Sequence, residues 1–200
     1  MSIFGRGFGG GTTVASKVPF PPNLAGATAT LNGTPLALYF VAPNQINAAL
    51  PLDAAAGTVR VTTAHGFAET QLDLFDTAPA IFPNAITHAN GTLVSAASPA
   101  APGETLVIYM TGLGQVDGRL DTGQPAPSSP LLRVTTPVEV QIGDVSVPAG
   151  FAGLSPGLVA VYQVNVAVPS NLTPKTYPIR VSVKGNASAP QSIPVQNRNP

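Results

Sequence analysis

The stretch PNQINAALP, residues 43–51, decides the fold, because a close copy of it returns as VYQVNVAVP at residues 161–169. Three residues of the first copy recur at a constant displacement of 118 positions. They are Gln45, Asn47 and Pro51, which return as Gln163, Asn165 and Pro169. In an extended strand, alternate side chains face opposite sides. The spacing therefore predicts that Ile46 and Val164 face a core and that the amides face the other way.

Two further pairs of segments agree with this repeat and follow the same order along the chain. SIFGRGFG, residues 2–9, aligns with VIYMTGLG, residues 107–114, at a displacement of 105, which places Gly7 over Gly112. TVRVTT, residues 58–63, aligns with PIRVSV, residues 178–183, at a displacement of 120, which places Arg60 over Arg180. Because the displacement changes only between the segments, we interpret the chain as a tandem duplication with its extra residues in loops.

Short runs of alternating or β-branched residues dominate the chain, and Gly, Pro, Asn or Asp bounds each of them. The segment LNGTP, residues 31–35, carries an Asn-Gly pair, which accepts the positive φ angles of a two-residue hairpin turn. Helical periodicity is almost absent. The sequence predicts an all-β chain of two tandem immunoglobulin-like β-sandwich domains, residues 1–77 and 78–200.

The two copies differ at their beginnings. The second starts with a strand-like segment around Ala78–Pro83, whereas the first starts directly at its SIFG segment. A sandwich without its first strand exposes unpaired backbone groups along an edge, and a strand from another chain can fill such an edge. We therefore expect a strand-exchange edge at Ser2, Ile3, Phe4 and Gly5. A truncated sequence is the alternative explanation.

The repeated amides have two interpretations. They can line a pair of ligand sites, or they can form a bracket that is repeated only because the architecture is repeated. We favour the bracket, since duplicated architecture already explains duplicated geometry. Pro51 and Pro169 are expected to end their strands, because proline lacks the N–H that a ladder needs.

Composition excludes several classes of function. Charged residues make up 9% of the chain, and nine basic residues balance nine acidic ones, so no field attracts nucleic acid. No apolar run approaches the about 18 residues that span a membrane, so no membrane insertion is expected. The chain has no cysteine, which excludes disulfides and thiolate sites. A net charge of zero makes self-association easier.

Two short motifs resemble sites of known chemistry without their context. GRGFGG contains the spacing G-x-G-x-x-G at residues 5–10, but the prolines that follow it leave no helix to receive a pyrophosphate. LDTG, residues 120–123, resembles an aspartic-protease motif that requires a second carboxylate, and the first copy offers none. Neither motif supports a cofactor or a catalytic site, so we expect no cofactor and no enzyme.

Other polar and aromatic residues give weak signals. His65 and His88, the two histidines, lie near no nucleophile motif and are expected in loops. Asp117, Asp121 and Asp144 lack the spacing of a dedicated calcium loop. Most aromatic residues lie in strand contexts that predict burial, which weakens a role in stacking on sugars. They are Phe4, Tyr39, Phe40, Phe75, Phe82, Tyr109 and Tyr162.

Nearly the whole chain, from Ser2 to about Val195, resembles the Solibacter-type C-terminal domain found in predicted secreted bacterial proteins. The segment FAGLSPGLVAVYQVNVAVP, residues 151–169, carries the most specific part of the resemblance. Each half also resembles the immunoglobulin-like IPT/TIG domains, whose first strand ends in a turn similar to IFGRGF, residues 3–8. The resemblance implies tandem immunoglobulin-like sandwiches in secreted material or at a cell surface, and it supplies no catalytic residues.

Two functions remain. In the first, the chain is a structural subunit of an extracellular filament or matrix, joined to copies of itself by strand exchange. In the second, it is a secreted adhesion or spacer module that binds a cell-surface or matrix polysaccharide. The low charge and the missing first strand lead us to favour the first. The second is the alternative, and the family resemblance alone supports it. Both place the protein outside the cell or at its surface.

Overall fold

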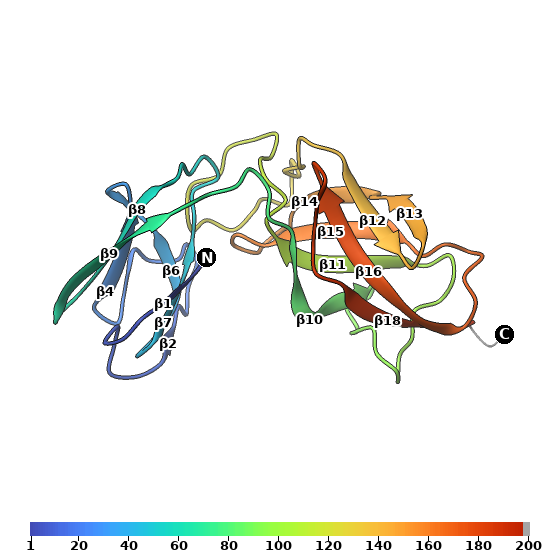
Figure 1. Ribbon diagram of the computed structural model, residues 1–200, viewed down its shortest axis with the longest axis horizontal. Coiled ribbons are helices and arrows are strands. Elements are labelled where there is room, and N and C mark those ends of the chain that lie inside the picture. Colours follow the sequence, from blue (N-terminus) through green and yellow to red (C-terminus); the bar gives the residue numbers. More distant parts are fainter. Residues whose placement is uncertain (198–200) are drawn as a thin grey trace. The chain divides into compact units, whose positions relative to one another are not determined.

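Figure 1 shows the computed structural model, which describes residues 1–197. Every regular element among these residues is a β-strand, which confirms the predicted all-β class and its tandem sandwiches. The chain divides into two compact units. Unit 1 consists of Met1–Phe75 and two segments from later in the chain, Arg119–Ser129 and Pro156–Ala160. Unit 2 consists of Asp76–Gly118, Pro130–Ser155 and the residues from Val161 onward.

Unit 1 contains two antiparallel sheets. The first has the order β1-β7-β6-β2, with bounds Ser2–Phe4, Gln45–Ala49, Ala37–Ala42 and Thr13–Val14. The second has the order β3-β4-β8-β9, with bounds Asn23–Leu24, Ala27–Leu31, Gly57–Thr63 and Gly66–Leu72. Strand β5, Thr34–Pro35, pairs with β4 across a turn at Asn32 and Gly33. Both turn residues have positive φ angles, 51° and 82°, as the Asn-Gly pair predicts.

Unit 2 also contains two antiparallel sheets. Its first sheet includes a strand, Ala80–His88, that has no counterpart beside β1 among the described residues. Its first sheet has the order β10-β11-β15-β14, with bounds Ala80–His88, Thr105–Thr111, Tyr162–Ala167 and Phe151–Leu154. Its second has the order β13-β12-β16-β17, with bounds Val145–Pro148, Val138–Ile142, Lys175–Val183 and Asn186–Ala187. Strand β18, Gln191–Val195, also pairs with β16.

Alternating apolar residues of both sheets fill each core. In unit 1 the core cluster joins residues of the two sheets, including Leu31, Leu38, Val41, Ile46 and Val61. In unit 2 the fully buried residues include Ile108, Val140, Val164, Ile179 and Val181. Ile46 and Val164 are both fully buried, which confirms the prediction that they face a core.

The ladder registers agree with the sequence repeat residue by residue. On β1, Ser2 lies opposite Asn47 and Phe4 lies opposite Gln45. On β11, Val107 lies opposite Asn165 and Tyr109 lies opposite Gln163. Strands β1 and β11 are therefore the same element in two copies. In the other sheets, Arg60 of β8 and Arg180 of β16 each lie opposite the corresponding neighbour, Thr30 of β4 and Gln141 of β12.

Candidate functional site

The outward side of the first sheet of unit 1 gathers the repeated amides and several aromatic residues. Ile46 and Val41 point into the core, so their neighbours along β7 and β6 point outward. Directly opposite residues in an antiparallel ladder lie on the same side of the sheet. We call this surface the aromatic–amide face. It comprises Phe4, Val14, Tyr39, Phe40, Gln45 and Asn47, together with Phe20, which lies against Tyr39.

The two amides of this face bond to each other. The Gln45 Nε2 donates to the Asn47 Oδ1 over 2.8 Å, and both side chains are partly exposed. Within residues 1–197, one N–H of the Gln45 amide and both N–H groups of the Asn47 amide have no hydrogen-bond partner. The pair therefore holds a fixed orientation while it presents donors outward.

Two aromatic residues of this face, Phe4 and Tyr39, are exposed, contrary to the prediction of burial, and Phe40 is partly exposed. Phe4 is 73% exposed and Tyr39 is 45% exposed. Tyr39 packs on Phe20 with their ring centroids 5.2 Å apart. A register shift between Leu38 and Phe40 turns Tyr39 away from the core. The prediction was also wrong for Phe75 and Phe82, which are exposed, whereas Tyr162 is buried as expected.

The other end of the same sheet face is covered. Ala37 and Ala49, opposite each other on β6 and β7, pack with Val159 and Phe20. Val159 belongs to the segment Pro156–Ala160, and the second added segment contacts the same region through Gly123. The Gly123 carbonyl accepts the Phe20 N–H over 2.9 Å. These two segments therefore fix the position of Phe20, and through it one border of the aromatic–amide face.

Unit 2 carries the counterpart of the amide pair with less exposed surroundings. The Gln163 Nε2 donates to the Asn165 Oδ1 over 2.9 Å, and the Gln163 Oε1 accepts the Ser155 hydroxyl over 3.1 Å. Phe151, opposite Asn165, is buried, and the Arg133 guanidinium lies 5.0 Å from the centre of its ring. The amide pair is thus common to both units, but the aromatic residue opposite its glutamine differs: Phe4, opposite Gln45, is 73% exposed, whereas Tyr109, opposite Gln163, is only partly exposed.

Each repeated proline follows the end of its strand and begins a turn. The Pro51 carbonyl accepts the Ala54 N–H over 3.2 Å, and the Pro169 carbonyl accepts the Leu172 N–H over 3.3 Å. The predicted edge residues Ser2, Ile3 and Phe4 form β1, and Gly5 follows it and donates its N–H to the Asn44 carbonyl. Within residues 1–197, β7 is the only strand paired with β1.

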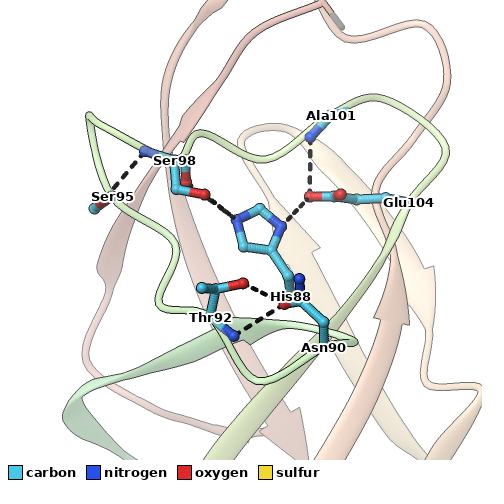
Figure 2. Close-up of polar contacts among 7 residues, drawn as sticks. All are labelled: His88, Asn90, Thr92, Ser95, Ser98, Ala101 and Glu104. Carbon is cyan, nitrogen blue, oxygen red and sulfur yellow. Dashed lines mark hydrogen bonds and ion pairs between the residues drawn. The ribbon is translucent and has the colours of Figure 1, made fainter.

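A second polar cluster lies in unit 2, where β10 ends and β11 begins (Figure 2). The His88 Nδ1 lies 3.0 Å from the Glu104 Oε1, and its Nε2 lies 3.1 Å from the Ser98 Oγ. The His88 and Glu104 side chains are both largely buried, at 14% and 10% exposed. A serine, a histidine and a carboxylate in this order are the elements of a hydrolytic triad.

The remaining contacts of this cluster argue against a nucleophile. The Ser98 backbone carbonyl also lies 3.1 Å from the His88 Nε2, and a carbonyl oxygen can only accept a hydrogen bond. A hydrogen bond between Nε2 and this carbonyl therefore requires that Nε2 carries the hydrogen. In that arrangement Nε2 has no lone pair with which to accept the Ser98 hydroxyl proton. The contacts of His88 with Glu104 and Ser98 are therefore structural, and we call these three residues the His88 latch.

Local turns position the members of the His88 latch. The Glu104 Oε1 also accepts the Ala101 N–H over 2.9 Å, and the Glu104 N–H bonds back to the Ala101 carbonyl. Gly103 has a φ of 81°, which suits the third position of this turn. The Ser98 N–H donates to the Ser95 carbonyl over 3.0 Å. The latch thus joins the end of β10 to the residue before β11 across a long connection.

Other candidate residues do not assemble into sites. His65 is exposed in the turn between β8 and β9, away from the His88 latch in sequence and contacts. The Asp117 Oδ1 accepts the Arg133 N–H over 2.8 Å, a structural bond. Residues 1–197 contain no group of three or more His, Cys, Asp or Glu that could hold a metal ion. Among the same residues, no helix is long and apolar enough to cross a membrane.

Burial perturbs the ionisation of one side chain in unit 2. Tyr162, on β15, is 8% exposed, and burial raises its pKa to about 12. Its hydroxyl donates to the Gly114 carbonyl, which keeps the neutral phenol bonded inside the fold. The position displaced by 118 in unit 1 is Asn44, so this buried phenol belongs to the second copy alone.

No sequence pattern predicted the exposed aromatic surface, the added segments of unit 1 or the His88 latch. The segment SPAAPGE, residues 98–104, did carry one signal, a Pro-Gly turn directly before a strand. Nothing local marks that His88 lies beside this turn, since the contact closes a long connection.

No family model matches the chain, and no curated protein matches it. Among solved structures, it is similar to the SGBP-B of the Bacteroides ovatus mixed-linkage glucan utilization locus, solved with a mixed-linkage heptasaccharide. The identity is 15%, over 86% of this chain and 37% of that one, with a TM-score of 0.35. It is also similar to a crystal structure with a xylogluco-oligosaccharide, at 14% identity over 100% of this chain and 37% of that one, with a TM-score of 0.32. The chain spans little more than a third of either structure, and TM-scores this low carry no argument about function.

Proposed function

We propose that the chain is a non-enzymatic module that binds a neutral polysaccharide through the aromatic–amide face of unit 1. The observation that carries this proposal is the exposure of Phe4 and Tyr39 beside the Gln45–Asn47 pair. The faces of sugar rings carry C–H groups that pack against aromatic rings, while sugar hydroxyls exchange hydrogen bonds with amides. A sheet face with both kinds of group suits an extended chain of sugars.

Charge restricts the class of polysaccharide. The side chains that form the aromatic–amide face are all uncharged, and the net charge of the chain is zero. Neither the face nor the whole chain attracts an acidic polysaccharide by its electrostatic field. A neutral glycan is therefore the class of ligand that this surface fits best.

Location and family membership are part of this proposal. A polysaccharide-binding module acts where polysaccharides lie, so we place the chain at a cell surface or in secreted material. The resemblance to the Solibacter-type C-terminal domain points to the same location and remains a prediction.

Self-assembly also stays a prediction. A filament or matrix subunit joined by strand exchange has one observation in its favour, the position of β1 at the edge of its sheet. Sedimentation of the purified chain over a wide range of concentrations tests this prediction. A constant monomer mass would contradict it, and growth in mass that Ser2→Pro abolishes would support it.

Affinity electrophoresis against neutral β-glucans, xylans and mannans tests the proposed function. We expect at least one polysaccharide to retard the chain, with Phe4→Ala and Tyr39→Ala each weakening the retardation about tenfold, since an aromatic contact contributes about 1 kcal/mol or more. Phe75→Ala is the matched control, because Phe75 is 78% exposed and lies outside the face. The proposal fails if no polysaccharide retards the chain or if Phe75→Ala weakens binding as much as Phe4→Ala.

A further inference from the structure

The tripeptide Asn-Gly-Thr occurs twice in the chain, at residues 32–34 and at residues 90–92. Both copies lie in exposed turns, the first between β4 and β5 and the second directly after β10. An asparagine that precedes a glycine can lose its side-chain amide in water, because glycine has no side chain to obstruct attack by its backbone nitrogen. Since the local sequence is the same, a difference in this reaction between the two asparagines comes from the folded structure.

The reaction closes a ring between the asparagine side chain and the next backbone nitrogen. The glycine nitrogen loses its proton and forms a bond to the asparagine Cγ, while the bond from Cγ to Nδ2 breaks and the Nδ2 group takes up a proton and leaves as ammonia. Water then opens this succinimide at either of its carbonyls, which gives aspartate or isoaspartate. The fold controls the first step, because the asparagine side chain must be free to reach the glycine nitrogen.

The fold holds the Asn32 side chain away from this reaction. Its Nδ2 donates to the Ala56 carbonyl over 3.2 Å, and its Oδ1 accepts the Thr58 N–H over 3.0 Å. Gly57 lies between these partners, and a Cβ at this position would lie only 1.9 Å from the Asn32 Oδ1. To reach the Gly33 nitrogen, the Asn32 side chain would have to break its bonds at both ends and leave this close contact.

The Asn90 side chain is bonded within its own turn (Figure 2). Its Oδ1 accepts the Thr92 N–H over 3.0 Å and also accepts the Thr92 hydroxyl. The loop that the bond to the Thr92 N–H closes contains all the atoms of the succinimide ring, so the side chain is already folded back toward the Gly91 nitrogen. Both donors stabilise the negative charge that develops on Oδ1 during the attack. Within residues 1–197, the Asn90 Nδ2 has no hydrogen-bond partner that would retain it as the leaving group.

One hydrogen bond opposes the reaction at Asn90. The Gly91 N–H donates to the His88 carbonyl over 2.9 Å, and this bond must open before the nitrogen can attack. Asn90 and Gly91 are both exposed, and a single bond of this kind changes an equilibrium by about fivefold. The bonds that hold Asn32 are more numerous and join segments distant in the sequence, so they slow the reaction more.

We propose that Asn90 is a site of spontaneous deamidation and that the fold protects Asn32 from the same reaction. Each converted molecule gains a carboxylate in the turn after β10, so ten acidic groups face nine basic ones and the net charge falls from zero to −1. Conversion to isoaspartate also adds one atom to the backbone of the turn that begins at His88. The inference goes beyond polysaccharide binding and does not depend on it, since this turn belongs to unit 2 and the aromatic–amide face to unit 1.

Peptide mapping of the full chain by mass spectrometry tests the proposal. The purified chain is incubated near neutral pH in its native state and, in parallel, unfolded in concentrated urea. Cleavage after Lys17, Arg60 and Arg119 puts the two asparagines in different peptides, and fragment masses locate each new acid. We expect Asn90 to convert at least tenfold faster than Asn32 in the native chain. In urea the two rates should agree within about twofold, because the local sequence is the same.

Asn90→Gln is the matched variant, because glutamine keeps the amide but has to close a larger and less favourable ring. Ion exchange of this variant should show no acidic form over the time in which most of the unchanged chain converts. Three results would overturn the proposal. They are equal rates at Asn32 and Asn90 in the native chain, conversion of Asn90 only in urea, and an acidic form of Asn90→Gln that appears as fast as that of the unchanged chain. Polysaccharide retardation is measured on freshly purified chain, so failure of one experiment leaves the other interpretable.

Discussion

Strands β1 and β11 occupy the same place in two copies of one sandwich, yet their surroundings differ. β11 lies between β10 and β15, whereas β1 pairs only with β7 among the described residues. Both face the same Gln-x-Asn motif in the same register. The comparison teaches that the repeated core residues specify how β1 and β11 align with their partner strands. Whether the other edge of each strand is covered depends instead on β10, which lies outside the repeat.

We expect the largest difference in stability between alanine substitutions at two equivalent glycines, Gly112 and Gly7. Gly112 has a φ of 80°, and a Cβ at this position would lie 1.8 Å from the Ala78 carbonyl oxygen. Gly7, its counterpart, has a φ of 76° with open space around it. Gly112→Ala should therefore lower the free energy of unfolding by more than about 3 kcal/mol, and Gly7→Ala by only about 1 kcal/mol, the cost of the left-handed backbone. Chemical denaturation measures both, and equal losses would break the comparison.

Alkaline pH should destabilise unit 2 through Tyr162. Its pKa is raised to about 12, so between pH 10 and 12 the unfolded chain loses this proton while the folded chain retains it. The stability contributed by the neutral phenol is complete below pH 10 and falls by up to about 1.4 kcal/mol per pH unit above it. Denaturation at several pH values should show a flatter decline in Tyr162→Phe. Tyr39→Phe, an exposed tyrosine of unit 1, is the control, and an identical decline in both variants would contradict the assignment.

The His88 latch holds the connection between β10 and β11, which unit 1 does not possess among residues 1–197. His88→Ala removes the largely buried ring that joins Glu104 to Ser98, and because buried polar contacts are lost we expect a loss of about 2 kcal/mol. Ser98→Ala keeps the backbone carbonyl that accepts from the ring and should change stability by less than about 0.5 kcal/mol. Labelling with a fluorophosphonate probe checks the chemistry. Labelling of Ser98 would contradict the latch and indicate a nucleophile.

The smallest effect should distinguish the two amide pairs. Asn47→Ala and Asn165→Ala each remove one hydrogen bond between partly exposed amides, with an expected loss of about 0.5–1 kcal/mol. Only Asn47→Ala should weaken polysaccharide retardation, since the aromatic residue opposite the glutamine is largely exposed in unit 1, where it is Phe4, and only partly exposed in unit 2, where it is Tyr109. Equal weakening by Asn165→Ala would show that the aromatic residues do not decide binding.

The sequence predicted the parts of the fold that depend on local pattern. Alternation around Ile46 and Val164 identified the core side of β7 and β15, and the spacing of Gln45 and Gln163 identified the register of both copies. Alternation does not reveal whether the opposite side of a sheet is covered, so Phe4 and Tyr39 were wrongly assigned to the core. The bulge beside Tyr39 also has no sequence signal as clear as a proline or an Asn-Gly pair.

Contacts between distant segments lie beyond such patterns. Gly123 and Val159 join unit 1 from loops of the second copy, and His88 meets Glu104 across a connection without regular periodicity. These contacts depend on how a whole unit closes, which no short window of sequence contains. The repeated amides show this limit of sequence patterns. The Gln45–Asn47 pair lies beside the exposed ring of Phe4, whereas the Gln163–Asn165 pair lies beside the buried ring of Phe151.

Amide hydrogen exchange of the isolated chain tests the central claim most directly. The Val107 amide, which faces β10, should exchange at least about a hundredfold more slowly than an unprotected amide. The amides of Ser2, its counterpart, and Phe4 should exchange at nearly unprotected rates. This result would establish that one copy of the sandwich has a closed edge and the other an open one. Slow exchange at Ser2 and Phe4 in a dilute monomer would contradict the account.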